Sequence, residues 1–203
     1  MTYDPDIHNR HSIRLKGYDY SFAGAYSVTI CVNGRESLFG DVTEGEMRLT
    51  DGGWIVERGW SALPERFPNV ELDEWIIMPN HFHGIIIIHD TVGAPLAAPN
   101  TSPNTSVATD NMNQGVLNQG AASGAPTVGE IIRAFKSISA VAVNRILNRQ
   151  GVPVWQRNYY ERVLRNEAEL DAARRYILDN PMKWGEDREN PVNAPAPANM
   201  PSP

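Results

Sequence analysis

The stretch ELDEWIIMPNHFHGIIIIH, residues 71–89, decides the fold of this chain. Residues 71–78 and 81–89 are each rich in apolar, β-branched and aromatic side chains, and a Pro-Asn pair separates them. Short apolar runs bounded by turn residues are typical of strands. The second run is almost wholly apolar after Gly84, which is typical of a strand covered on both faces. The stretch therefore predicts two adjacent strands at the centre of a sheet.

Toward the N-terminus the sequence predicts a further strand, a hairpin and a helix. Residues 25–32 (AYSVTICV) are rich in β-branched and aromatic side chains and end at an Asn-Gly turn pair. The segments 37–42 and 46–50 flank a Glu-Gly turn, so we expect them to form the hairpin. From Asp51 the apolar spacing becomes helical and continues until Pro64.

Toward the C-terminus the sequence predicts two helices on either side of an extended segment, residues 154–163. The first helix begins at the capping box TVGE, which starts at Thr127. Its expected buried face consists of Ile131, Phe135, Ile138, Ala142 and Ile146. Asn166 begins the second helix, because a glutamate follows three residues later, and this helix ends at Asn180, which precedes a proline.

This order of elements predicts an α+β fold, namely a ferredoxin-like sandwich with a mainly antiparallel central sheet and helices packed on it. The 203 residues suit one domain, which we place at residues 1–184. Within it, residues 90–126 contain almost no large apolar side chain, so we expect a disordered insertion. Residues 185–203 are rich in proline and lack apolar periodicity, so we expect a flexible tail.

Composition restricts the location and the partners of the protein. The single cysteine, Cys31, lies in an apolar run and excludes a disulfide framework. No apolar segment resembles a signal peptide or a membrane span, so we expect a cytoplasmic protein without a membrane partner. The net charge of −6 by itself argues against a nucleic-acid partner. However, residues 131–175 hold nine basic and four acidic side chains, which permits a DNA-binding face, although composition by itself favours ordinary solvated helix faces.

His81 and His83 are the first candidates for chemistry. Alternate residues of a strand project from the same face, so the two imidazoles form a pair that can bind a divalent cation if a third ligand joins them. The His-x-His pattern alone is weak, but two polar rings at the entry of a buried strand need a partner. Amidohydrolase barrels and metallo-β-lactamases supply further histidines downstream, whereas only His89 follows here.

The last helix supplies the missing groups. Tyr176 and Asn180 are four residues apart and therefore share one helical face. The phenol is a nucleophile that can attack phosphorus, and the amide oxygen can complete a metal shell begun by two imidazoles. Taken alone, Tyr176 would be interpreted as a half-buried packing residue.

Three runs of sequence carry a resemblance to a known family. They are MPNHFHGIIII (residues 78–88), VWQRNYYERVLRNEAEL (residues 154–170) and YILDNPMKW (residues 176–184). The chain resembles the REP-associated tyrosine transposases, which belong to the single-tyrosine HUH class. The early stretch GYDYSFAGAYSVTICVNGRESLFGDV (residues 17–42) resembles the same family, so the similarity spans nearly the whole chain except the insertion and the tail.

The resemblance implies a role for each candidate residue. The histidine, hydrophobe, histidine motif of the family falls on His81, Phe82 and His83, with the histidines as metal ligands. The metal-binding asparagine falls on Asn180 and the nucleophile on Tyr176. The tyrosine follows the histidine motif, as in the small transposases, whereas relaxases of the same class have the reverse order.

Four other tyrosines compete with Tyr176 as the nucleophile. Tyr18 and Tyr20 precede the histidine motif, which makes them poor candidates. Tyr159 and Tyr160 are stronger competitors, but they precede the capped helix and have no amide one turn beyond them.

The resemblance also implies an activity and a partner. We expect a metal-dependent single-stranded DNA endonuclease and strand transferase, using Mg or Mn, that cleaves and rejoins DNA beside REP-type hairpins through a 5′-phosphotyrosine. The expected DNA contacts are Arg133, Lys136, Arg157 and Arg162. Tyr159 or Tyr160 can stack on unpaired bases, and packing inside the domain is an equal alternative for at least one of them. A monomer is favoured, with a dimer as the alternative. Two rival functions stay open: a domesticated hairpin-binding protein that no longer cuts, and an unrelated metal-dependent hydrolase that forms no covalent adduct.

Overall fold

The computed structural model describes residues 20, 22–90 and 126–193. Its strands are β1 (Gly24–Cys31), β2 (Gly40–Thr43), β3 (Glu46–Leu49), β4 (Val70–Ile77), β5 (His81–Ile88) and β6 (Tyr160–Leu164). Its helices are α1 (Asp51–Ser61), α2 (Leu63–Arg66), α3 (Val128–Ile146) and α4 (Glu167–Leu178), with the short 3-10 turns η1 (Asn33–Arg35), η2 (Pro181–Glu186) and η3 (Pro191–Asn193). The predicted α+β class and ferredoxin-like arrangement are confirmed: four strands form an antiparallel sheet in the order β4-β5-β1-β6.

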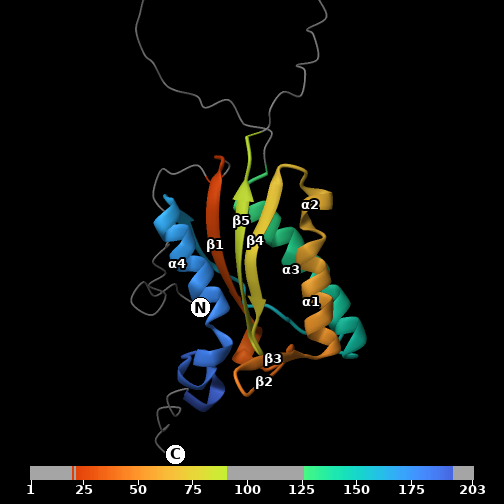
Figure 1. Ribbon diagram of the computed structural model, residues 1–203. Helices are drawn as coiled ribbons and strands as arrows, with labels where there is room; N and C mark the ends of the chain where they lie inside the picture. The colour runs from red at the N-terminus through yellow and green to blue at the C-terminus, as the bar shows by residue number, and fades with distance from the viewer. Residues whose placement is uncertain (1–19, 21, 91–125, 194–203) are drawn as a thin grey trace, which may run out of the picture.

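The sheet separates two layers of helices. Helices α1 and α3 cover one face, and α4 covers the other (Figure 1). The hairpin of β2 and β3 forms a separate two-stranded sheet below the main one. Strand β5 lies between β1 and β4, so its side chains alternate between the α1/α3 layer and the α4 layer.

The larger hydrophobic core lies between the sheet and helices α1 and α3. Three aromatic rings meet at its centre: the centroid of Trp60 lies 4.4 Å from that of Phe82 and 5.2 Å from that of Phe135. Phe82 belongs to β5 and projects into this layer, so the two neighbouring histidines project into the other. The alternation predicted for this strand is confirmed.

The apolar face predicted for α3 is partly wrong. Ile138 and Ile146 are 49% and 45% exposed, whereas α3 buries Ser139 and Val143. The helical period allows either of two neighbouring rows of side chains on α3 to be buried, and contact with α1 determines which row it is. A Cβ at Gly59 of α1 would lie 3.8 Å from the side chains of both Phe135 and Ser139, so this glycine lets that stripe approach closely.

Gly84 on β5 should tolerate no side chain. A Cβ there would lie 2.6 Å from Cζ2 of Trp60 and 2.8 Å from the ring of Phe82, and both rings are fully buried. Overpacking of this kind costs about 1–3 kcal/mol, so Gly84→Ala should lower the free energy of unfolding in urea by that amount. Gly185→Ala is the control, because no atom lies within 4 Å of its Cβ position. Equal stability of the two variants would contradict the packing argument.

A smaller core holds α4 against the other face of the sheet. Ile85 and Leu164 from the sheet and Ile177 from α4 form it, with partly buried apolar side chains around them. The predicted cap of this helix is confirmed, because Asn166 Oδ1 accepts a hydrogen bond from the backbone N–H of Glu169. The other predicted cap, at Thr127, is confirmed as a capping box.

The polypeptide after α4 corrects the expectation of a flexible tail over residues 185–203 for its first part. Residues 185–193 continue into η3, Asn190 is buried, and Glu189 pairs with Arg35. This order comes from polar contacts with distant residues, for which apolar periodicity gives no signal. Residues 194–203 and, apart from its two ends, the expected insertion at 90–126 lie outside the described residues. None of the helices in the described ranges is long and apolar enough to cross a membrane.

Candidate metal and nucleophile site

His81 and His83 lie side by side on the α4 face of the sheet. Both side chains are buried, and their ring centroids are 4.7 Å apart at an interplanar angle of 77°. Strand β5 sets this spacing because its period of two returns both rings to the same face. The prediction that the two imidazoles lie together on one face of the strand is therefore confirmed.

A hydrogen bond to Asn80 orients the ring of His81. The Nδ2 group of Asn80 donates to the carbonyl oxygens of Arg35, at 3.1 Å, and Glu189, at 2.6 Å, so its Oδ1 faces the ring. This Oδ1 lies 2.9 Å from Nδ1 of His81 and has only lone pairs to offer. Nδ1 therefore carries the proton and donates it, which leaves Nε2 with a free lone pair.

His83 has a similar anchor on the neighbouring strand. Its Nδ1 lies 2.8 Å from the hydroxyl oxygen of Thr29 on β1. The hydroxyl can accept a hydrogen bond from Nδ1–H, which again directs the lone pair of Nε2 away from the anchor.

Burial keeps both imidazoles neutral. Desolvation lowers the pKa of His81 to about 4, although Asp187 and Asn180 oppose this effect. Desolvation, with a further contribution from the positive charge that His81 would carry, lowers the pKa of His83 to about 3. Neutral imidazole is the form that binds metal ions, so the pair has the required protonation state at neutral pH.

Helix α4 brings Tyr176 and Asn180 to the two histidines. The ring of Tyr176 meets that of His83 edge to face, with centroids 5.2 Å apart. Tyr176 is 53% exposed, so its phenol lies at the solvent side of the pair, whereas Asn180, just beyond the end of α4, is only 3% exposed. The two residues occupy one side of the helix end, as their spacing predicts.

Three buried polar atoms of this cluster have no hydrogen-bond partner among the described residues: His81 Nε2, His83 Nε2 and Asn180 Oδ1. An unpartnered buried polar atom costs free energy, and each native example requires an explanation. Two imidazole nitrogens and one amide oxygen are a donor set of the kind that can bind a divalent cation. No group of three His, Cys, Asp or Glu side chains in the described ranges is arranged to hold a metal ion.

An ion pair fixes α4 on the edge strand β4. The guanidinium of Arg174 donates from Nε and Nη2 to the two carboxylate oxygens of Asp73, at 2.9 and 2.6 Å. This contact holds the pKa of Asp73 below its ordinary value. Asp73 lies at a break in the β4-β5 register between Leu72 and Trp75, where the bulge projects its side chain toward the helix. The clamp lies two residues before Tyr176.

The chain beyond α4 forms one wall of the cluster, which the sequence pattern did not predict. The ring of Trp184 in η2 lies 5.9 Å from that of His81. Oδ2 of Asp187 lies 3.9 Å from His81 Nε2, which is too long for a hydrogen bond. In the sequence, the only indication that these residues lie near the histidines is that they follow shortly after Asn180.

The remaining histidine and the competing tyrosines lie in other surroundings. His89 pairs with Glu71 at 2.8 Å on the surface. The hydroxyl of Tyr159 donates to Glu161 at 2.7 Å, and its ring packs against the larger core. Tyr160 is exposed on β6, opposite Thr29 in the register. Tyr18 lies outside the described residues, and Tyr20 is buried.

Of the four basic residues predicted to bind DNA, Lys136 contacts Arg157, Arg133 lies on the same helix as Lys136, and Arg162 lies on β6. Arg133 projects to solvent from α3, on the opposite side of the sheet from the histidines. Lys136 is occupied: its ammonium donates to the carbonyl oxygens of Gln156, Arg157 and Asn158, and desolvation lowers its pKa. These carbonyl oxygens already engage its N–H donors, whereas a phosphate contact at Lys136 stays a prediction. The exposed Arg157 precedes β6, and Arg162 on β6 pairs with Glu169.

Comparison with known proteins finds similarity both in sequence and in structure. No family model matches the chain. The solved structure is that of a REP-associated tyrosine transposase bound to a REP hairpin, with a TM-score of 0.51 and 17% identity over 86% of this chain and 77% of that one. An uncharacterized protein of Haemophilus influenzae is 38% identical over 186 residues, which cover 92% of this chain and 96% of that protein. The chain therefore has a transposase-like fold and belongs to the same family as this Haemophilus influenzae protein.

Proposed function

We propose that the protein is a metal-dependent tyrosine nuclease and strand transferase that acts on single-stranded DNA beside hairpins. One observation carries the proposal: three buried donor atoms without partners, on His81, His83 and Asn180, lie beside the exposed phenol of Tyr176. A bound cation would satisfy all three atoms together, which supports the proposal. The shared fold with a transposase bound to a REP hairpin supports the choice of substrate.

The donor set fits a divalent cation such as Mg or Mn. His81 and His83 would each bind through Nε2, because Asn80 and Thr29 occupy the Nδ1 atoms, and Asn180 would bind through Oδ1. Three ligands leave open positions for substrate oxygen. When bound, such a cation supplies Lewis-acid polarisation of a phosphoryl oxygen.

Tyr176 carries the covalent step in this proposal. Its hydroxyl oxygen attacks the scissile phosphorus, a new O–P bond forms, and the bond between phosphorus and the 3′-oxygen breaks. The phenolic proton passes to solvent, and the departing 3′-oxygen takes up a proton from solvent. The products are a 5′-phosphotyrosine and a free 3′-hydroxyl. Attack of a 3′-hydroxyl on the phosphotyrosine reverses the step and rejoins DNA.

The experiment that tests this proposal uses a pool of DNA oligonucleotides, each with a hairpin stem and randomised single-stranded flanks. Incubation with Mg or Mn is followed by a denaturing gel, with EDTA as the control. A label on the 3′ end should migrate with the protein, because the phosphotyrosine holds the fragment with the new 5′ end. A label on the 5′ end should appear as a shortened free strand. Sequencing of the covalent fraction then identifies the cleavage site.

Each rival function predicts a different gel. Hairpin binding without cleavage would favour the domesticated binding protein. Shortened strands without a covalent adduct would favour an unrelated metal-dependent hydrolase. Light scattering of the free protein and of the complex tests the proposed monomer against a dimer.

Asn80 should increase the affinity for the metal ion through its hydrogen bond to His81, without being a ligand itself. Its side chain selects the tautomer of His81 that leaves Nε2 free, and loss of such an outer partner typically reduces metal affinity about 10- to 100-fold. We expect this reduction for Asn80→Ala, measured by Mn²⁺ titration with electron paramagnetic resonance. Asn144→Ala is the matched control, because Asn144 donates to the carbonyl oxygen of Val152 at 2.7 Å on α3, away from the histidines. Equal Mn²⁺ affinities in the two variants would show that Asn80 does not position His81 for metal binding.

A further inference from the structure

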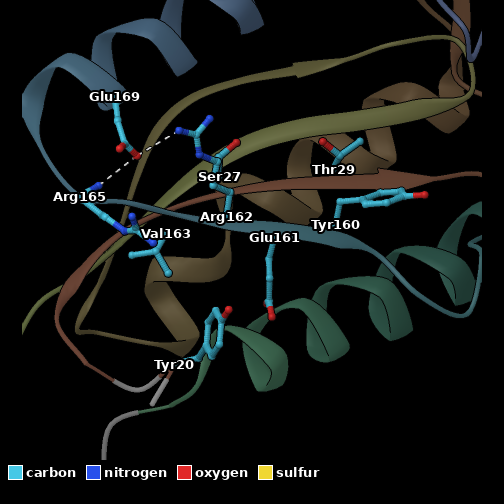
Figure 2. Close-up of a pocket in the computed structure, with 9 residues that line it drawn as sticks. All are labelled: Tyr20, Ser27, Thr29, Tyr160, Glu161, Arg162, Val163, Arg165 and Glu169. Atoms are coloured by element: carbon cyan, nitrogen blue, oxygen red, sulfur yellow. Dashed lines mark hydrogen bonds and ion pairs between the residues drawn. The ribbon is translucent and has the colours of Figure 1, made fainter. Parts of the chain in front are cut away.

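A cleft opens along the edge of the sheet where β1 pairs with β6. Its volume is about 420 Å³. The residues that line it, shown in Figure 2, include Ser27 and Thr29 of β1, Tyr160, Glu161 and Arg162 of β6, and Glu169 of α4. Small-ligand sites typically have volumes of about 300–1,000 Å³, so this cleft suits one nucleotide rather than an extended duplex.

The cleft adjoins the metal and nucleophile site. Thr29 lines it and also contacts Nδ1 of His83 at 2.8 Å. In the antiparallel register, Tyr160 lies opposite Thr29, and Arg162 lies opposite Ser27. Opposite residues project from the same face of a sheet, so these four side chains form a row that leads away from the histidines along the α4 face.

The row carries the chemistry that binds an unpaired nucleotide. Tyr160 is 59% exposed and offers a flat ring for stacking on a base. The hydroxyls of Ser27 and Thr29 can donate to or accept from the base and the sugar. The side chain of Arg162 is 71% exposed and can reach a phosphate.

The acidic residues of the cleft are already paired. Glu161 accepts from the hydroxyl of Tyr159 at 2.7 Å and projects from β6 toward α3, away from the row (Figure 2). Glu169 accepts from the backbone N–H of Arg165 and pairs with Arg162 at 3.2 Å. The ion pair holds Arg162 over the cleft, and a nucleotide phosphate would replace the carboxylate as its partner.

We propose that this cleft binds the unpaired nucleotide next to the scissile phosphate, with its base stacked on Tyr160 and its phosphate on Arg162. The inference rests on the proposed function, and it adds a recognition element for the single-stranded flank. It also assigns Tyr160, the rival nucleophile, a binding role instead.

The test compares two DNA probes by fluorescence anisotropy in EDTA, so that binding is measured without cleavage. One probe is a blunt hairpin, and the other is the same hairpin with the single-stranded flank found in the adduct experiment. Tyr160→Ala should bind the flanked probe about tenfold more weakly than wild type and the blunt hairpin equally well, because stacking on the flank is lost. Tyr160→Trp and Tyr160→Phe should restore the affinity.

A fluorescent base locates the nucleotide. With 2-aminopurine at successive flank positions, one position should be quenched by the wild type and by Tyr160→Phe but not by Tyr160→Ala. Equal binding of the flanked probe by wild type and Tyr160→Ala, without position-dependent quenching, would overturn the inference even if the covalent adduct forms. If no adduct forms but the flank discrimination depends on Tyr160, the nuclease proposal fails and the nucleotide cleft stands; the flank is then chosen from the pool by binding selection.

Discussion

Tyr176→Phe should abolish the covalent protein-DNA adduct, by at least about a thousandfold, because the variant lacks the attacking oxygen. Binding of the hairpin and of metal should stay unchanged. The phenylalanine ring keeps the edge-to-face contact with His83 at a centroid distance of 5.2 Å, and the hydroxyl that is removed lies on a side chain that is 53% exposed. The measurement is the denaturing gel with 3′-labelled DNA, together with anisotropy of the blunt hairpin.

Tyr160→Phe is the matched control for this prediction. It removes the same atom from the other exposed tyrosine on the α4 face, and the adduct should still form. Mass spectrometry of the wild-type adduct should place the phosphate on the peptide that contains Tyr176. Persistence of the adduct in Tyr176→Phe, with the phosphate mapped to Tyr159 or Tyr160, would overturn the choice of nucleophile.

His81→Ala should abolish both the metal-induced stabilisation and the adduct. A ligand that binds only the folded state stabilises it by about 2.7 kcal/mol at 100 times its Kd, so saturating Mn²⁺ should raise the melting temperature of the wild type by several degrees. His81→Ala removes one of the three unpartnered donors, and the melting temperature should then no longer respond to Mn²⁺. Thermal scans with and without Mn²⁺ measure the difference.

His89→Ala is the control for the metal prediction. This histidine lies just beyond the same strand, but it pairs with Glu71 on the surface, and the variant should keep the full response to Mn²⁺. Adduct formation in EDTA would show that the reaction needs no metal ion. An unchanged Mn²⁺ response in His81→Ala would show that His81 is not a metal ligand.

The sequence predicted the features that depend on local pattern. Strand alternation placed His81 and His83 on one face, and the spacing of Tyr176 and Asn180 placed them together at the end of one helix. The resemblance to a family then connected the two pairs, which lie about a hundred residues apart in the chain. No periodicity could have made that connection.

The sequence failed where the deciding contacts are distant and polar. Asn80 is held by the carbonyl oxygen of Glu189, and this contact orders a segment that composition describes as a tail. The sequence gives no sign that the ammonium group of Lys136 contacts three backbone carbonyl oxygens. Ile138 fits the period of the buried stripe, but the packing of α1 leaves it exposed.

Two hydrophobic cores, one on each face of the sheet, separate the packing around the candidate site from that of the larger helical layer. Tyr176 and Asn180 depend on the small core of Ile85, Leu164 and Ile177 and on the clamp between Arg174 and Asp73, whereas the main sheet depends on the aromatic cluster of the opposite layer. We therefore expect substitutions beneath α4 to shift Tyr176 relative to the histidines more than they disturb the aromatic cluster. If the proposed cleavage activity holds, such substitutions would silence it while every residue of the histidine motif is kept.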